Sequence, residues 1–236
     1  VGVHGASESG RRALTAWLDT AVDWDLMVAP GPMNDAASVT LPQAAVAELA
    51  ALPGVEEVSV QRQVGVTSRG RSVTMIALGG FGLNAGGRLD VVQSADLSGS
   101  ATWLDLRQGQ AVALSVALAD QLAVTVGDRL PLTTPDGESE FEVVALVNDP
   151  AARTDAAYIA LDSYAAMWGD GGVDSVVMRL SPGTEAVAVA SSVGARQPGG
   201  AVKVPLHVTL AGAYRADLLA AAADTFRASG LMVLLA

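Results

Sequence analysis

The two histidines are the first side chains to consider for metal or acid–base chemistry. His4 lies among small residues near the start of the chain, and His207 lies in an apolar stretch between Leu206 and Val208. They do not form the H-x-x-x-H spacing that lets two imidazoles bind one zinc ion from a single helix face. The chain also has no cysteine, so Cys-ligated zinc, thiolate nucleophiles and disulfides are excluded. We therefore expect no metal site and interpret His207 as a structural residue.

Serine and glycine motifs do not indicate an active site either. Ser115 could form a Ser-His-Asp triad with His207 and an aspartate, but no G-x-S-x-G nucleophile elbow is present. Ser115 directly precedes a helical pattern, so we interpret it as a helix cap. The segment Gly79–Gly87 is rich in glycine, yet it lacks the strand-turn-helix context of a dinucleotide-binding loop. We expect an ordinary loop there.

The nearest approach to a paired-carboxylate site is formed by Asp149 and Asp155, which flank a short polar segment. Their spacing matches neither an EF-hand calcium loop nor the carboxylate pair of a glycosidase. We therefore expect a solvated loop, and for the chain as a whole we predict no catalytic residue, no metal and no cofactor.

Charge and composition argue against nucleic-acid binding and predict a folded protein. The 236 residues include 14 Lys plus Arg and 25 Asp plus Glu, a net charge of −11, which is the wrong sign for neutralising nucleic-acid phosphates. Half of the residues are apolar, so a folded core is expected. The chain ends in the apolar run Leu231–Ala236, but no stretch reaches the about 20 apolar residues that a spanning helix needs. We expect a soluble fragment of a larger membrane protein.

The sequence contains two β-α-β patterns, which are separated by a long insert. The predicted elements are strands at Asp25–Ala29, Glu57–Val66, Asp174–Leu180 and Ala201–Thr209, with a helix capped by Thr40 and a helix capped by Thr184. This order predicts an α+β fold with a split βαβ, ferredoxin-like subdomain over residues 22–68 and 173–210. Right-handed crossovers place both helices on one face of the sheet and leave the other face free for a partner.

The insert, residues 69–172, is predicted to be a mainly β subdomain. Its predicted elements are hairpins at Ser68–Arg71 and Thr134–Gly137, a helix at Val116–Leu122 capped by Ser115, and a helix at Ser163–Trp168 capped by Asp162.

Amphipathic patterns at both ends of the chain predict two flanking stalk helices, at residues 1–21 and 211–236, the second leading to a membrane span. Their apolar faces should pack on each other or on the sheet, and aromatic residues in them suit a membrane interface. The candidate interface residues are Leu14, Trp17, Leu18, Tyr214, Leu218 and Phe226.

An ordered set of motifs resembles the MacB-like, FtsX-like permeases of ABC transporters. From Gln110 to Val147 a strand, a small helix ending in A-x-x-L, a V-G-D-x-L turn, a D-G hairpin and a V-V-x-x-V strand follow in the family's order. Asp25–Val28, Leu52–Val55, Tyr158–Tyr164 and Val176–Gly183 also fit that order and spacing. The resemblance spans about Leu14 to Ala236.

The resemblance implies an extracytoplasmic core domain inserted between the first two membrane helices of a permease, with a porter-like α/β part and a mainly β part. Such a domain is non-catalytic and couples cytoplasmic ATPase-driven motion to the export or handling of a lipid, lipoprotein, peptide or drug, or to an extracellular partner. The implied partners are a cytoplasmic ABC ATPase acting through the rest of the permease, a second permease copy or paralogue, and an extracellular protein or lipid. The implied location is the extracytoplasmic face of the cell membrane.

Two other classes stay open at the level of sequence. One is a surface-anchored extracellular binding module, and the other is a hydrolase with an unrecognised triad.

Overall fold

A computed structural model describes residues 15, 18, 22–31, 39–83, 89–94, 105–107, 109–148, 156–196 and 205–221. Within this part of the chain, ten strands form one mixed sheet in the order β10-β1-β9-β2-β3-β8-β5-β7-β4, with β6 paired to β7. The strands are β1 Leu26–Ala29, β2 Val55–Ser68, β3 Arg71–Gly80, β4 Asp90–Ser94, β5 Ala111–Ser115, β6 Arg129–Thr134, β7 Gly137–Asn148, β8 Ala156–Ala160, β9 Ser175–Leu180 and β10 His207–Leu210. The helices are α2 Gln43–Ala50, α4 Val116–Leu122, α5 Leu161–Trp168, α6 Ala186–Arg196 and the 3₁₀ turn η1 Phe81–Leu83, and residues 211–221 are also helical.

One end of the sheet, here called the α/β half, contains β10, β1, β9 and the first part of β2. These four strands are antiparallel to their neighbours, and α2 and α6 connect strands that are not adjacent. This is the strand order of a split βαβ sandwich. Both helices contribute to the same apolar core, which includes Leu49 of α2, Val193 of α6 and Val28 of β1. The predicted α+β fold with its split βαβ unit is therefore confirmed.

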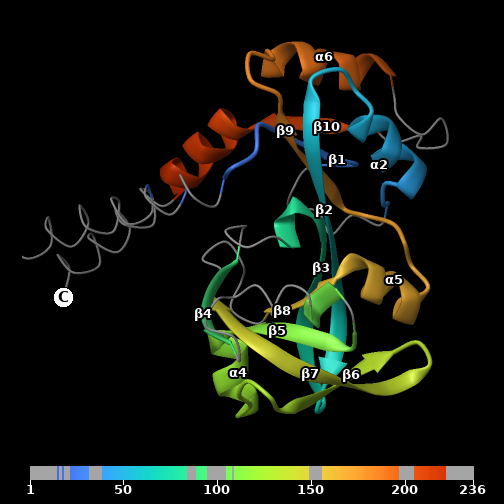
Figure 1. The fold of residues 1–236 in the computed structure, drawn as a ribbon, viewed down its shortest axis with the longest axis vertical. Coiled ribbons are helices and arrows are strands. Elements are labelled where there is room, and N and C mark those ends of the chain that lie inside the picture. The colour runs from blue at the N-terminus through green and yellow to red at the C-terminus, as the bar shows by residue number, and fades with distance from the viewer. Residues whose placement is uncertain are drawn as a thin grey trace, which may run out of the picture.

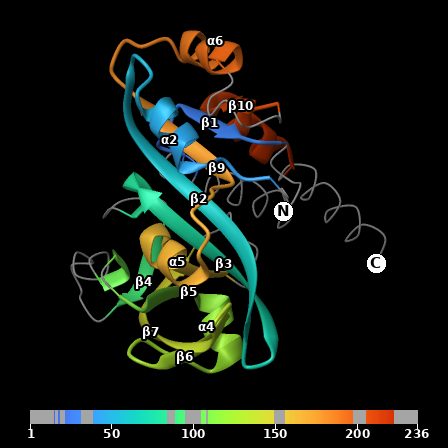
Figure 2. The ribbon, with the colours of Figure 1, turned by 90° about the vertical axis from the view of Figure 1, so that its right-hand side faces the viewer.

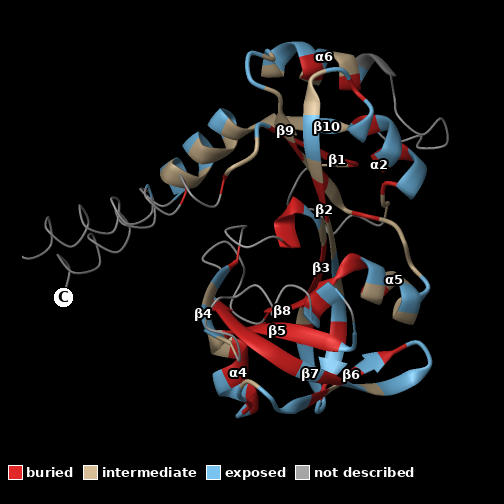
Figure 3. Cartoon of the chain, in the orientation of Figure 1, coloured by how far each residue is buried: buried red, intermediate tan, exposed pale blue. Residues whose placement is uncertain are grey.

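The other end, here called the β half, contains the rest of β2, the strands from β3 to β8, and the helices α4 and α5 (Figure 1). Its strands β5 and β8 are fully buried, and so is most of the second half of β7 (Figure 3). The predicted hairpins join β2 to β3 and β6 to β7, where Ser68 pairs with Arg71 and Thr134 with Gly137. The expected cap of α4 is also present, because the Leu118 N–H donates to Ser115 Oγ at 3.3 Å.

Three predicted helix caps and one predicted loop are wrong. Pro42 is the N-cap of α2 and Ala160 that of α5, and neither cap has a side-chain hydrogen bond, so Thr40 and Asp162 do not cap these helices. In both cases the residues before the helix are extended, which moves the helix start relative to the polar side chain. The carbonyl of Glu185 accepts the first helical bond of α6, which excludes Thr184 as its cap. In the segment expected to be a loop, Gly79–Gly87, residues 79–83 form the end of β3 and η1, and residues 84–87 lie outside the described residues.

Strand β2 continues from one half into the other (Figure 2). Its residues 55–61 pair with β9, and its residues 59–68 pair with β3. The sheet is thus continuous across the expected boundary between residues 68 and 69. The division into subdomains at 1–21, 22–68, 69–172, 173–210 and 211–236 stays a prediction.

We expect the α/β half to fold without the β half. Gln61 of β2 lies opposite Ser175 of β9, so an Asn-Gly turn replacing residues 63–173 closes a hairpin between two strands that already pair. The shortened chain should give a mixed α/β circular dichroism spectrum and a cooperative thermal transition. Adding Val28→Asp, a charge in the core, should abolish that transition. A shortened chain that gives only a coil spectrum would contradict the two-part organisation.

Candidate functional site at the root of the terminal helices

Three of the six predicted stalk residues, Leu18, Tyr214 and Leu218, are described, and they belong to the segments that precede β1 and follow β10. Leu18 is 1% exposed, and its carbonyl accepts the N–H of Val22. Tyr214 and Leu218 are half-buried on the helix at 211–221, which lies beside residues 22–25 (Figures 1 and 2). The other three candidates, Leu14, Trp17 and Phe226, lie outside the described residues. We call residues 22–25 together with 210–215 the stalk root.

Direct contacts hold the two sides of the stalk root together. The rings of Trp24 and Tyr214 lie 5.4 Å apart between centroids, and the guanidinium of Arg215 donates to the carbonyl of Val22. The N–H of Ala211 donates to the carbonyl of Asp25 at 3.0 Å. The two segments then continue as β1 and β10, which pair with each other. Both ends therefore enter the sheet as neighbouring strands.

Arg179 of β9 connects this root to the rest of the sheet. Its Nε donates to the carbonyl of Asp23 at 3.0 Å, and its Nη2 contacts the carboxylate of the same residue. Its Nη1 donates to Glu57 Oε2 of β2 at 2.9 Å, and its guanidinium carbon lies 4.0 Å from the ring centroid of Phe81. Burial alone would lower the pKa of Arg179, but the hydrogen bonds to Asp23 and Glu57 outweigh it and raise the pKa. Arg179 therefore stays charged and joins three segments that are distant in sequence.

The backbone around Gly80 places Phe81 beneath Arg179. Gly80 has φ of +71°, and a Cβ atom there would lie 2.1 Å from the carbonyl oxygen of Val58, so no other residue fits. Buried Ser59 fixes the same turn, since its hydroxyl donates to the carbonyl of Gly79 at 2.7 Å and accepts the N–H of Gly82 at 3.0 Å. The turn from β3 into η1 is thus tied to β2 by both packing and hydrogen bonds.

A surface hollow of about 520 Å³ lies at the stalk root, between residues 22–25, the start of α6 and the start of the helix at 211–221. Its lining includes the carboxylates of Asp23, Asp25 and Glu185 and the guanidinium of Arg215. Asp25 is bonded to the sheet, because its carboxylate accepts the N–H of Leu180 in β9 at 2.7 Å. Asp23 contacts Arg179 and Arg215 donates to the carbonyl of Val22, so three of these four charged groups hold the root to the sheet or to itself.

The residues considered for catalysis are not brought together. Ser115 is buried in the β half, where its hydroxyl also accepts the N–H of Ala156, whereas His207 is exposed on β10 in the α/β half. The elements that carry them, β5 and β10, lie in different halves of the molecule, so Ser115 and His207 cannot belong to one catalytic triad (Figure 1). Asp149 and Asp155 lie outside the described residues. In the described part of the chain, no three His, Asp or Glu residues are grouped so that they could hold a metal ion.

Residues 1–196 match the family model of the MacB-like periplasmic core domain. The chain belongs to this family. The expected identification as an extracytoplasmic domain of a MacB-like ABC-transporter permease is confirmed. This membership favours the permease interpretation over a surface-anchored binding module or a hydrolase, since the family is that of a transporter domain.

Relatives of this periplasmic core domain agree with the assignment. An uncharacterized ABC transporter permease protein of Mycobacterium tuberculosis is 28% identical over 195 residues, which is 80% of this chain. The chain spans only 22% of the length of that protein. Among solved structures, the periplasmic region of MacB from Actinobacillus actinomycetemcomitans has a TM-score of 0.63 at 12% identity, covering 85% of this chain and 95% of that one. The extracellular domain of the noncanonic ABC-type transporter YknZ from Gram-positive bacteria has a TM-score of 0.55 at 16% identity, covering 79% and 98%.

In the described part of this periplasmic core domain, no helix combines the length and apolar character needed to cross a membrane.

Sequence reasoning missed Arg179 and its partners. The strand pattern of Ser175–Leu180 did contain a signal, because an arginine stands between Met178 and Leu180 in an otherwise apolar run. A cation in a central strand requires anionic partners, but the sequence does not reveal that Asp23 and Glu57 supply them.

We expect Arg179→Met to destabilise the domain by about 1–2 kcal/mol, because two carboxylates lose a charge-assisted partner that is only 31% exposed. The free energy of unfolding in urea, measured on the 236-residue chain, tests this. Arg129→Met is the matched control, since its 3.8 Å ion pair with Glu142 is 62% and 51% exposed and should change stability by less than about 0.5 kcal/mol. Equal effects of the two substitutions would contradict a special role for Arg179.

Proposed function

We propose that this domain couples ATP-driven motion of the permease's membrane part to the export or handling of a substrate outside the cytoplasm, or to an extracellular partner. In this proposal a cytoplasmic ABC ATPase drives the permease, a second permease copy or paralogue completes the assembly, and the domain performs no bond chemistry itself. The substrate class stays as broad as lipid, lipoprotein, peptide or drug. The domain stands on the extracytoplasmic face of the cell membrane.

The observation that carries the proposal is the direct entry of both chain ends into the sheet. β1 lies between β10 and β9, and it pairs with both through backbone hydrogen bonds. The helix at 211–221 follows β10 directly, and the irregular residues 22–25 before β1 are held by hydrogen bonds from Arg179, Arg215 and the N–H of Ala211. A displacement of the root would therefore act directly on the backbone hydrogen bonds that join β10, β1 and β9. These paired strands deform less easily than a flexible connection would.

Strand β2 supplies the path from the root to the far end. Arg179 bonds Asp23 of the root to Glu57 of β2. Strand β2 has 14 residues in all, which at about 3.3 Å per residue is a strand of roughly 45 Å, and Glu57 lies near its start. Because β2 pairs along its length with β9 and then β3, it can act as a stiff lever.

Locking the stalk root in the full-length permease tests the proposal. Trp24→Cys with Tyr214→Cys, joined by a short bis-maleimide crosslinker, should lower ATP turnover in proteoliposomes several-fold while leaving ATP binding unchanged. The reason is that the hydrolysis cycle requires movement at the root, whereas nucleotide binding at the cytoplasmic subunit does not.

The control pair is Thr133→Cys with Glu138→Cys, which lie opposite each other on the β6–β7 hairpin, far from the root. Crosslinking this pair should leave turnover unchanged. A root-crosslinked permease with the turnover of the uncrosslinked protein would overturn the coupling proposal.

A further inference from the structure

Within the residues that the structure describes, the chain passes between the two halves at two places. It leaves the α/β half along β2, and it returns through residues 169–174, between α5 and β9. The return segment has the sequence Gly-Asp-Gly-Gly-Val-Asp, in which Val173 is the single apolar side chain. Three glycines give the segment wide backbone freedom, so side-chain contacts must fix its course.

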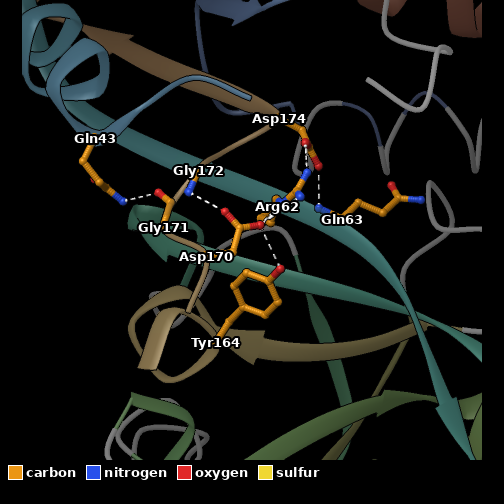
Figure 4. Close-up of polar contacts among 8 residues, drawn as sticks. All are labelled: Gln43, Arg62, Gln63, Tyr164, Asp170, Gly171, Gly172 and Asp174. Atoms are coloured by element: carbon orange, nitrogen blue, oxygen red, sulfur yellow. Dashed lines mark hydrogen bonds and ion pairs between the residues drawn. The ribbon is translucent and has the colours of Figure 1, made fainter. Parts of the chain in front are cut away.

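Arg62 of β2 provides the central contact (Figure 4). Its Nε and Nη2 lie 3.0 and 2.9 Å from Asp170 Oδ2, and its Nη1 lies 2.7 Å from Asp174 Oδ1. The guanidinium thus binds a carboxylate near each end of the return segment. We call Arg62, Tyr164, Asp170 and Asp174 the Arg62 clasp.

Both carboxylates of the clasp also accept hydrogen bonds from groups other than Arg62. Asp170 accepts the Tyr164 hydroxyl at 3.1 Å and the N–H of Gly172 at 3.0 Å, and Asp174 accepts the N–H of Gln63 at 2.6 Å. Burial would raise the pKa of Asp170, but the bonds from Gly172 and Arg62 prevail and lower it. Asp170 is therefore charged in the folded protein.

The clasp joins elements of both halves. Tyr164 belongs to α5 and stacks on Trp168 with ring centroids 5.2 Å apart, and Trp168 lies beside Phe141 of β7 in the β half. On the other side, the return segment bonds to the start of α2 in the α/β half. Val173 forms a β-bridge with Leu41, and the Gln43 side chain donates to the carbonyl of Gly171 at 2.9 Å.

Arg62 occupies a position on β2 whose neighbours of the same parity are valines. Val58, Val60, Val64 and Val66 have the same parity on β2 and pack into the core. Arg62 interrupts this row at the level where the α/β half meets the β half. A valine there would give non-directional packing, whereas a guanidinium with two carboxylates fixes direction as well as distance.

We propose that the Arg62 clasp is a conformational latch that sets the angle between the two halves: closed, it makes the domain move as one body, and open, it lets the β half swing about β2. The latch itself is a property of the isolated domain. Its use in transmitting motion rests on the proposed function.

Distance measurements on the 236-residue chain test the latch. The chain has no cysteine, so Ser191→Cys on α6 and Asp120→Cys on α4, both exposed, accept spin labels at opposite ends of the molecule. Double electron–electron resonance should give one narrow distance distribution. With Arg62→Met the distribution should become about twofold broader or more, because no cation then joins the two carboxylates of the return segment to β2.

Arg129→Met in the same labelled background is the matched control, since it removes an arginine ion pair within the β half and should leave the width unchanged. Asp170→Asn and Tyr164→Phe are milder variants that retain the Arg62–Asp174 pair and should broaden the distribution less. They keep the test valid where Arg62→Met does not fold.

The outcome separates a latch from a purely stabilising contact. Variants that lose thermal stability but, while folded, keep the distance distribution of the unsubstituted chain would overturn the latch. Such a result would leave the proposed coupling function intact, because that proposal depends on the stalk root and is tested in the full-length permease.

Discussion

Strand β2 hydrogen-bonds to β9 through its first residues and to β3 through the rest, and this pairing is the constraint that makes one sheet of two halves. At Ser59–Gln61 it pairs on both sides at once. Any tilt of the β half relative to the α/β half must therefore twist β2 or strain its ladder. The other contacts between the halves act by limiting that twist.

Local patterns were sufficient to predict most of the elements. The alternation of valines in β2, the Asp-Gly turn of the β6–β7 hairpin and the Ser115 cap of α4 each depend on residues close in sequence. The order of strands and helices then limited the α/β half to a split βαβ topology, because right-handed crossovers leave few alternatives. The family resemblance agreed with that order.

Long-range polar contacts were beyond such reasoning. Arg179 reaches Asp23 and Glu57, which are 156 and 122 positions away, and Arg62 reaches Asp170 at a separation of 108. Each arginine was visible as a cation in an apolar strand pattern, but 25 acidic residues could have served as its partner. The caps expected at Thr40 and Asp162 failed for a related reason: neighbouring extended backbone, not the local sequence, decides where α2 and α5 begin.

The clusters around Arg179 and Arg62 both fix the orientation of parts that apolar packing alone would leave free to rotate. Ala, Val and Leu supply most of the core, and packing of such side chains resists separation far better than it resists sliding or rotation. Orientation must be fixed where the chain enters the sheet and where it returns from the β half. At both places an arginine on a strand binds two carboxylates, Asp23 and Glu57 in one case and Asp170 and Asp174 in the other. Charge-assisted hydrogen bonds have preferred angles, so they supply the directional constraint that apolar packing lacks. In the proposed coupling function, the apolar core would hold the two halves together and the two arginine clusters would set their orientation.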